Sequence, residues 1–365
     1  MTIFIYAVLI FLVIRFSVTV FNFLSNPKLP RVVKHYHDKV SILIPARNEA
    51  DNILKLLISI KDQDYANYEV IVLDDNSTDN TLSIVENFCT ANPQFKVVNG
   101  KELLPDWLGK NYACHQLSEL ASGKYLLFID ADESIKRGLI NSLINRMEIG
   151  NLALLSVFTN QTIKSIGEWL TVPLMHFMLL NLLPLRLVRL SKNPAFAAAS
   201  GQCMFFNANQ YQENQWHAKV KGRVVEDVEI MKLVKQEKLN AEALLANGLI
   251  YCRMYKNLAE SLNGFSKNLL AGFGNNIIIL LLYQLLVTLG PIILILNFNV
   301  ALLILPLTLI LLSRIMISYL SGQNVIINLV LHAFQMLFFL IISIISITKY
   351  TFKTGTWKGR TIKTI

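Results

Sequence analysis

Two carboxylates, Asp130 and Asp132, stand one residue apart directly after an apolar run at residues 125–129. The run has the length and composition of a buried strand. In an open α/β sheet, ligands bind outside the carboxyl ends of the strands. Two carboxylates at that position can ligate a hard divalent cation together with the phosphate oxygens of a substrate. The pattern therefore favours a metal and diphosphate site, although Asp-x-Asp also occurs in solvent-exposed turns.

A second acidic segment, residues 74–79, follows another apolar run. If both runs are parallel strands of one sheet, Asp75 emerges at the same edge as the first pair of carboxylates. The alternative is a plain turn in which Ser77 or Thr78 caps the helix that follows.

Between these segments, Gly109 precedes Lys110 at the apparent start of a helix. A helix amino terminus that carries a lysine favours an anion such as a diphosphate. A C-capping glycine next to a solvated lysine would have the same local sequence.

A third acidic feature, Glu226 and Asp227, lies among valines just before a helical segment expected at residues 230–239. A carboxylate at this point could act as a general base if it reaches the hydroxyl that it deprotonates. Alternatively, the two charges have no catalytic role and simply complement the helix dipole.

The elements that must position these groups alternate between apolar strands and helix-like segments over residues 40–236. This alternation indicates an α/β domain with a mostly parallel sheet. Its first strand is expected at residues 40–44, followed by a loop at 45–49. The chain returns to a strand near Gly201, which permits close backbone approach to a ligand or simply packs at the sheet edge.

The composition adds membrane segments to this domain. The 365 residues are 53% hydrophobic, with a mean hydropathy of +0.44. Residues 1–24 are long and apolar enough for an N-terminal membrane anchor, and no cleavage site follows them. Four basic residues come next, which marks the cytoplasmic side of a first span and predicts a cytoplasmic catalytic region. They are Lys28, Arg31, Lys34 and Lys39.

Two further regions are apolar. Residues 163–190 are strongly apolar but carry several polar groups, and they lie between Asp132 and Asp227. These two residues must be on the same side of the membrane to share a site, so the segment cannot cross it alone. We therefore expect interfacial helices that place the pocket at the lipid surface; an internal core helix is the alternative. Residues 277–348 contain three runs long enough to span. Three crossings would put the C-terminus outside, whereas the basic tail, residues 349–365, indicates the inside. We therefore expect a multi-pass cell-membrane protein in which one run re-enters or lies flat.

The charge and the cysteines exclude other classes. The net charge of +9 comes from Lys and Arg near apolar segments, without a nucleic-acid fold signature, which favours anionic lipid over nucleic acid. The four cysteines are widely spaced, so they are read as reduced core or pocket residues.

Together, five motifs in order resemble those of family 2 inverting glycosyltransferases. They are Ile-Pro-Ala-Arg-Asn-Glu at 44–49, Asp-Asp-x-Ser-Thr-Asp at 74–79, Gly-Lys-x-x-Ala at 109–113, Asp-Ala-Asp at 130–132 and Glu-Asp at 226–227. The resemblance implies the GT-A nucleotide-sugar-binding fold for a catalytic domain at residues 40–250. Residues 107–110, 253–255 and 357–360 are most similar to membrane-bound lipid glycosyltransferases of the carotenoid (diaponeurosporenoate) glucosyltransferase type.

The resemblance also implies roles for single residues. The uridine pocket would be lined by Pro45, Arg47, Glu49 and Asp75. Lys110 would approach the nucleotide or sugar, and Asp130 and Asp132 would hold the diphosphate through Mg²⁺ or Mn²⁺. Asp227 would be the base, with Glu226, Arg253 and Gly201 near the acceptor or diphosphate. The Gln-x-x-Arg-Trp signature of processive synthases is absent, and Arg253-Met254-Tyr255 occupies the comparable region, which argues against polymerisation.

The sequence thus predicts a membrane-bound glycosyltransferase that moves a hexose from a nucleotide sugar, such as UDP-glucose, to a lipid with inversion. Three alternatives stay open: a catalytically inactive nucleotide-sugar-binding membrane protein, an enzyme acting on a polysaccharide, and a transporter. A transporter would need intramembrane charges, which are nearly absent from the apolar runs.

Overall fold

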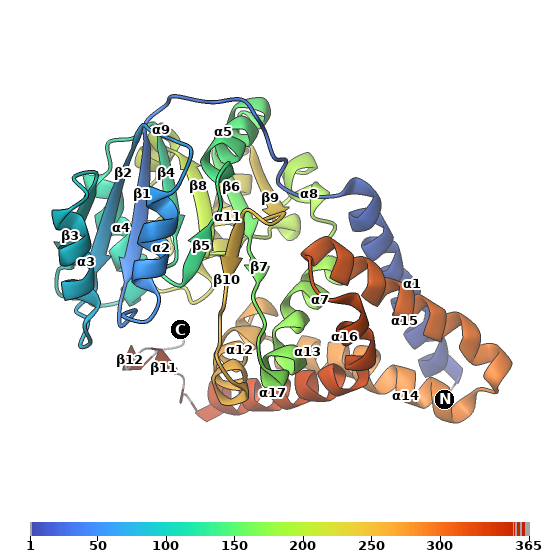
Figure 1. Cartoon of the computed structure of the whole chain (residues 1–365). Coiled ribbons are helices and arrows are strands. Elements are labelled where there is room, and N and C mark those ends of the chain that lie inside the picture. The colour runs from blue at the N-terminus through green and yellow to red at the C-terminus, as the bar shows by residue number, and fades with distance from the viewer. Residues whose placement is uncertain (1, 353, 355, 358–359, 362–365) are drawn as a thin grey trace. The chain divides into compact units, whose positions relative to one another are not determined.

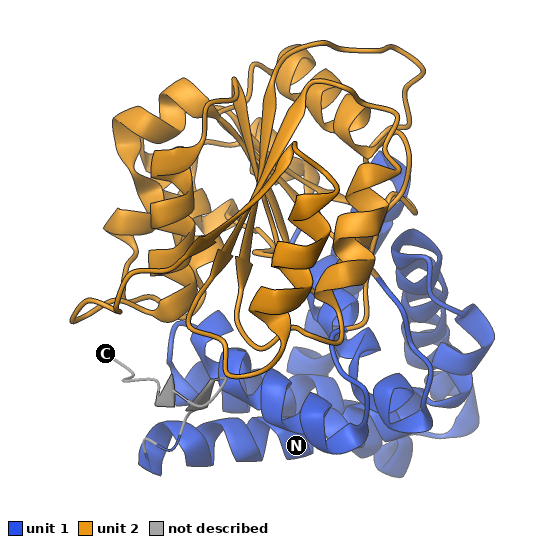
Figure 2. Cartoon of the chain, turned by 60° about the vertical axis from the view of Figure 1, so that its left-hand side comes forward, with its two compact units in different colours: residues 1–26, 161–184, 254–364 blue, residues 27–160, 185–253, 365 orange. Residues whose placement is uncertain are grey.

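The computed structural model describes residues 2–352, 354, 356–357 and 360–361. The chain forms two compact units, coloured separately in Figure 2. One unit comprises residues 27–160 and 185–253 and contains the main sheet. The other comprises residues 1–26, 161–184 and 254–364 and is built from apolar helices.

The described main sheet has seven strands in the order β3-β2-β1-β4-β8-β6-β9. Of these, β8 alone runs antiparallel to its neighbours β4 and β6, so the sheet is mostly parallel, as the sequence predicts. The strands are β1 (Val40–Ala46), β2 (Tyr68–Asp74), β3 (Phe95–Asn99), β4 (Tyr125–Ile129), β6 (Leu154–Phe158), β8 (Cys203–Asn207) and β9 (Ala241–Leu245).

The strands are apolar on both faces because helices cover both faces. Alternate residues of β1, such as Ile42 and Ile44, join a core with side chains of α2, α3 and α5. Figure 1 shows α2 in front of β1. On the other face, the ring of Phe128 packs against Tyr211 and His217. The helices of this unit are α2 (Ile53–Lys61), α3 (Thr81–Thr90), α4 (Gly109–Leu120), α5 (Leu139–Gly150), α8 (Arg186–Leu190), the 3₁₀ turn η1 (Pro194–Phe196), α9 (Ala208–Asn214), α10 (Trp216–Lys219) and α11 (Glu226–Gln236).

A small second sheet has the order β5-β10-β7. Its strands are β5 (Glu133–Ile135), β7 (Asn160–Gln161) and β10 (Ile250–Cys252). Because β5 begins directly after the Asp-Ala-Asp segment, this sheet continues from the edge where the acidic residues lie.

The helical unit contains four described helices that are long and apolar enough to cross a membrane. They are α1 (Thr2–Ser25), the continuous stretch Ile277–Asn297, α15 (Val300–Ser321) and α17 (His332–Phe352). The stretch Ile277–Asn297 is divided by a π-helical turn into α13 (Ile277–Gln284), η2 (Leu285–Leu289) and α14 (Gly290–Asn297). The remaining elements are α6 (Ile166–Thr171), α7 (Pro173–Leu182), α12 (Leu258–Gly272), α16 (Val325–Val330) and the short strands β11 (Thr356–Trp357) and β12 (Arg360–Thr361).

Residues 163–190, expected as one interfacial helix pair, form three short helices. Two of them, α6 and α7, group with the apolar helices, whereas α8 groups with the sheet. Together, α6 and α7 form the apolar stretch Ile166–Leu182, which is shorter than each of the four candidate spans. Of the basic tail, residues 353, 355, 358–359 and 362–365 lie outside the described residues.

The structure corrects one local expectation and decides between the alternatives at two other positions. The helix expected from residue 230 begins four residues earlier, at Glu226, since the acidic side chains favour its first turn. Neither Ser77 nor Thr78 caps α3; instead Asp79 accepts hydrogen bonds from the Thr81 amide and hydroxyl. Gly109 begins α4, so the C-cap alternative is wrong.

Candidate active site

The carboxyl ends of β1, β2 and β4 lie at one edge of the sheet because these strands are parallel. Arg47, Asp75 and Asp130 each directly follow one of these strands. Since β8 runs the other way, its amino end lies at the same edge, and Gly201 lies just before it. One edge therefore gathers groups from four separate parts of the sequence.

The first two loops are joined by Arg47. Its guanidinium donates hydrogen bonds to the carbonyl oxygens of Asp75 and Asn76, the second at 2.9 Å. The Asp75 amide donates to the carbonyl of Ala46 at 2.8 Å. Asp75 is buried, and Asn76 has a positive φ of 53°, a conformation that asparagine tolerates well. These contacts fix Asp75 in place.

The other two residues expected around a uridine lie at the end of β1 and in the loop that follows it. Pro45 is part-buried near the end of β1, where it is paired with Leu73 of β2. Glu49 accepts a hydrogen bond from Asn52 at 2.8 Å, and its amide donates to the Thr81 hydroxyl at 2.8 Å. The structure thus brings Pro45, Glu49 and Asp75 to neighbouring loops at the same edge.

Lys110 is the centre of an ion-pair network. Its ammonium lies 2.7 Å from Asp130 Oδ1 and 2.9 Å from Asp130 Oδ2. It also donates to the Gly201 carbonyl at 3.2 Å and lies 3.4 Å from Glu226 Oε1. Burial alone lowers the pKa of Lys110, but Asp130 and Glu226 raise it well above its usual value. The lysine is therefore a fixed positive charge.

Asp227 lies beside this network, in the first turn of α11. Its Oδ2 accepts a hydrogen bond from the Gly201 amide at 2.7 Å, and its Oδ1 accepts one from the Val228 amide at 2.8 Å. Burial and the neighbouring charge of Glu226 raise the pKa of Asp227 to about 7. A carboxylate with such a pKa can accept a proton near neutral pH.

Gly201 holds open the space between these groups. A Cβ atom placed at this residue would lie 3.0 Å from Glu226 Oε1, 3.1 Å from Lys110 Nζ and 3.6 Å from Asp227 Oδ2. Both the carbonyl and the amide of Gly201 are used, by Lys110 and Asp227. A side chain at this position would therefore crowd the charged groups of the protein itself, which is why the backbone here needs a glycine.

Asn111, which follows Lys110 in the first turn of α4, holds the loop that leads to Asp227. Its side-chain amide donates to the carbonyl oxygens of Val220, Lys221 and Arg223 at 3.0, 3.2 and 3.1 Å. The sequence reasoning did not identify this residue, because the contact joins segments 109 or more positions apart.

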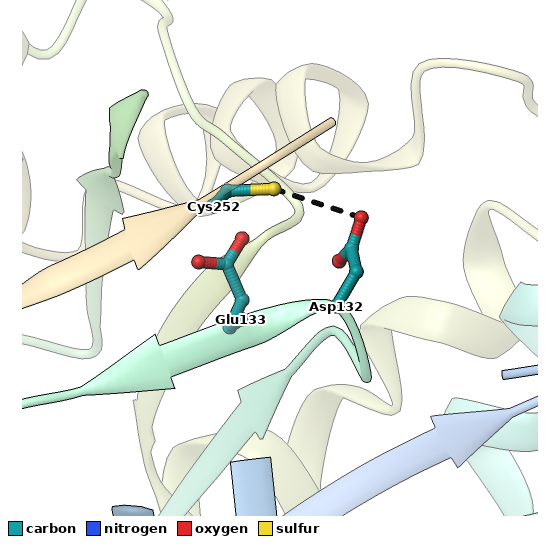
Figure 3. Close-up of side chains that lie close together, drawn as sticks. All are labelled: Asp132, Glu133 and Cys252. Carbon is teal, nitrogen blue, oxygen red and sulfur yellow. Dashed lines mark hydrogen bonds between the residues drawn. The ribbon is translucent and has the colours of Figure 1, made fainter. Parts of the chain in front are cut away.

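The second carboxylate of the Asp-Ala-Asp segment has different neighbours. Asp132 lies with Glu133 and Cys252, and one ligand atom from each lies within 4.8 Å of the others (Figure 3). Burial, Asp132 and Asp130 raise the pKa of Glu133 well above its usual value. Sequence reasoning missed Glu133 and Cys252. Arg253, which it singled out, directly follows Cys252 at the end of β10.

The mostly parallel α/β sheet is a fold of the GT-A type. Residues 41–212 match the sequence profile of glycosyl transferase family 2.

Several curated relatives carry the name 4,4'-diaponeurosporenoate glycosyltransferase. The protein from Staphylococcus aureus (strain USA300) is 27% identical over 243 residues, which cover 65% of this chain and 62% of the relative. The protein from Staphylococcus haemolyticus (strain JCSC1435) is 26% identical over 240 residues, 64% of this chain and 61% of the relative. The chain thus spans less than two thirds of the length of these relatives.

Among solved structures, a mannosyltransferase from Pyrobaculum calidifontis, in complex with GDP-Man and Mn²⁺, matches with a TM-score of 0.56 and 15% identity. The match covers 95% of this chain and 99% of that chain. It supports the fold. Staphylococcus aureus TarS residues 1–349 in complex with UDP match with a TM-score of 0.43 and 19% identity, over 64% of this chain and 65% of that chain.

Proposed function

We propose that this protein is a membrane-bound glycosyltransferase that moves a hexose from a nucleotide sugar to a lipid acceptor with inversion, with Asp227 as the general base. The observation that carries the proposal is the convergence of Asp130, Lys110, Gly201 and Asp227 at one edge of a domain that matches the family 2 profile.

The donor would lie across the loops after β1, β2 and β4. Arg47 holds the first two loops together through its hydrogen bonds. Pro45, Glu49 and Asp75 would then surround the base and ribose of the nucleotide. Lys110, at the first turn of α4, presents a positive charge and a helix amino terminus to the diphosphate. The charges thus favour binding of an anionic donor at this edge.

A divalent cation fits the acidic part of the edge, because oxygen ligands from Asp132 and neighbouring carboxylates suit Mg²⁺ or Mn²⁺. In addition, the buried oxygens of Glu133 accept no hydrogen bond from any described residue other than the neighbouring Cys252. When bound, such an ion supplies a positive charge that offsets the charge on a departing nucleoside diphosphate. Asp132 would hold the cation, while the neighbouring Asp130 stays paired with Lys110.

Asp227 would take the proton of the acceptor. Its Oδ2 is held by the Gly201 amide, and the absence of a side chain at Gly201 lets Asp227 and Lys110 approach the backbone there. A single base on the acceptor side is sufficient for a one-step displacement with inversion. Glu226, which lies near Lys110, would mainly position that lysine.

The acceptor class follows from two observations. The curated relatives are named for a diaponeurosporenoate acceptor, and four helices of the described chain are apolar and long enough to span a bilayer. We therefore propose a carotenoid-like or other lipid alcohol or acid as the acceptor. The basic residues after α1 favour a catalytic unit on the cytoplasmic side.

The test uses purified full-length protein in nanodiscs, a panel of nucleotide sugars and a total lipid extract. Release of nucleoside diphosphate together with a new glycolipid in the mass spectrum is the expected result. Tight donor binding without release would favour an inactive nucleotide-sugar-binding protein, and a water-soluble polymer would favour a polysaccharide synthase.

A further inference from the structure

The cluster of Asp132, Glu133 and Cys252 contains a thiol, which a magnesium site has no need of. The Cys252 sulfur lies 3.6 Å from Asp132 Oδ2, and Figure 3 shows the three side chains converging on one point. All three residues belong to the unit that carries the main sheet.

Strand pairing fixes this geometry. In the small sheet, β5 and β10 are antiparallel, and Cys252 stands directly opposite Glu133. Side chains of directly opposed residues lie on the same face, with Cβ atoms about 4.5–5.5 Å apart. Asp132 is held in the turn just before β5. The convergence therefore follows from backbone register as well as from side-chain rotamers.

Glu133 is the independent sign that this cluster binds something. Its side chain is 1% exposed, and outside this cluster neither carboxylate oxygen has a hydrogen-bond partner among the described residues. A buried carboxylate without a partner is costly.

Other buried glutamates of the same unit are satisfied. Glu69 accepts hydrogen bonds from Ser41 at 2.6 Å and Ser122 at 2.9 Å. Glu242 accepts two from Arg146, at 2.7 and 2.9 Å. The fold thus supplies donors to buried carboxylates elsewhere, but no described residue outside the cluster donates to Glu133. A bound cation would satisfy it.

Asp130 is engaged differently, since both of its oxygens contact the ammonium of Lys110. A cation at this edge is therefore expected on the side of Asp132.

We propose that Asp132, Glu133 and Cys252 form one cation site in which the Cys252 sulfur is a direct ligand. On binding, the thiol loses its proton to solvent and the sulfur binds the metal as a thiolate. Thiolate ligands select borderline or soft divalent ions, whereas Mg²⁺ keeps oxygen ligands in octahedral geometry. The site therefore prefers Mn²⁺, Co²⁺ or Zn²⁺ over Mg²⁺. The link of this ion to donor turnover rests on the proposed function; the site itself does not.

The experiment titrates the purified, metal-free full chain with Co²⁺ in the absence of donor, and follows the thiolate-to-cobalt charge-transfer band in the near ultraviolet. The wild type is expected to show this band at one equivalent. Cys252→Ser should lose the band, and Glu133→Gln should bind Co²⁺ at least about tenfold more weakly. Cys89→Ser is the matched control, since Cys89 lies on α3 outside the cluster, and it should keep the band.

A second measurement needs no variant. X-ray absorption at the cobalt edge of the wild type should show one sulfur ligand among oxygen ligands, so the test holds even if Cys252→Ser misfolds. A shell of oxygen and nitrogen alone would overturn the proposal, as would a band that survives in Cys252→Ser.

Donor turnover separates this proposal from the proposed function. In the wild type, Mn²⁺ should support faster turnover than Mg²⁺, and Cys252→Ser should lower the Mn²⁺-to-Mg²⁺ ratio of rates. If the protein binds cobalt through sulfur but cleaves no nucleotide sugar, the proposed cation site stands and the proposed glycosyltransferase function is refuted. If the wild type turns over donor but shows no cobalt–sulfur bond, the function stands and the proposed cation site is refuted.

Discussion

Replacing Asp227 with asparagine removes the proposed base while keeping its size and an oxygen that can accept the Gly201 amide hydrogen. General-base assistance contributes about 10²- to 10⁴-fold to a rate. Glycosyl transfer to a lipid alcohol, or to water during donor hydrolysis, should therefore fall by about that factor in Asp227→Asn. Donor affinity should change little, because the donor contacts are assigned to other loops.

The chemistry of the acceptor gives an internal control. A carboxylic acid, with a pKa of roughly 4, is already ionised at neutral pH and needs no base. Transfer to a lipid acid should then fall by less than about tenfold in Asp227→Asn, while transfer to a matched alcohol or to water falls much further. The comparison separates the loss of a base from a general loss of folding.

The pH dependence follows from the pKa of Asp227, which burial and Glu226 raise to about 7. The active form is the deprotonated one, so kcat for hydrolysis should rise with pH through this value. Between pH 8 and pH 6 the ionised fraction falls about tenfold, and the wild-type rate should fall with it. Asp227→Asn should lack this acid limb.

The assay measures radiolabelled sugar in lipid and water products over this pH range. A wild-type rate that is flat from pH 6 to pH 8 would refute the reasoning. So would an Asp227→Asn variant that hydrolyses donor at more than a tenth of the wild-type rate while Glu226→Gln is the weaker enzyme.

Three further substitutions test the edge of the sheet. Lys110→Met should weaken donor binding about ten- to hundredfold by calorimetry, because a charge-assisted hydrogen bond contributes about 1.5–3 kcal/mol; Lys124→Met, which removes an exposed ion pair with Asp38, should leave it unchanged. Gly201→Ala should lower kcat while the melting temperature changes little, because the new methyl group would lie 3.0 Å from Glu226 Oε1, the movable end of a side chain; an unchanged kcat would contradict the close approach. Asn111→Ala removes three hydrogen bonds to the loop before α11, so the free energy of unfolding in urea should fall by about 1–3 kcal/mol, and an unaltered midpoint would contradict that role.

The sequence predicts much of the sheet edge because the signals there are local. Each acidic or basic group directly follows an apolar strand or begins a helix, so strand direction alone places Asp75, Asp130 and Lys110. The parallel sheet and the part of the site built on its first strands therefore follow from the order of residues along the chain.

The cluster around Cys252 could not be predicted in this way. It depends on pairing between β5 and β10, two three-residue strands, and its cysteine and aspartate lie 120 positions apart. Strands this short carry little hydrophobic periodicity. Tertiary strand pairing thus decided what local sequence left open. The start of α11 at Glu226, by contrast, has a local cause, since the acidic side chains favour its first turn.

The most direct test of the central claim is transfer of label from a nucleotide sugar to lipid by the purified full chain in nanodiscs. With a radiolabelled nucleotide hexose and a carotenoid-containing lipid extract, we predict that label enters the organic phase in step with nucleoside diphosphate release, and that Asp132→Asn abolishes both. An organic phase without label across the panel of donors, from a protein that binds those donors, would contradict the account.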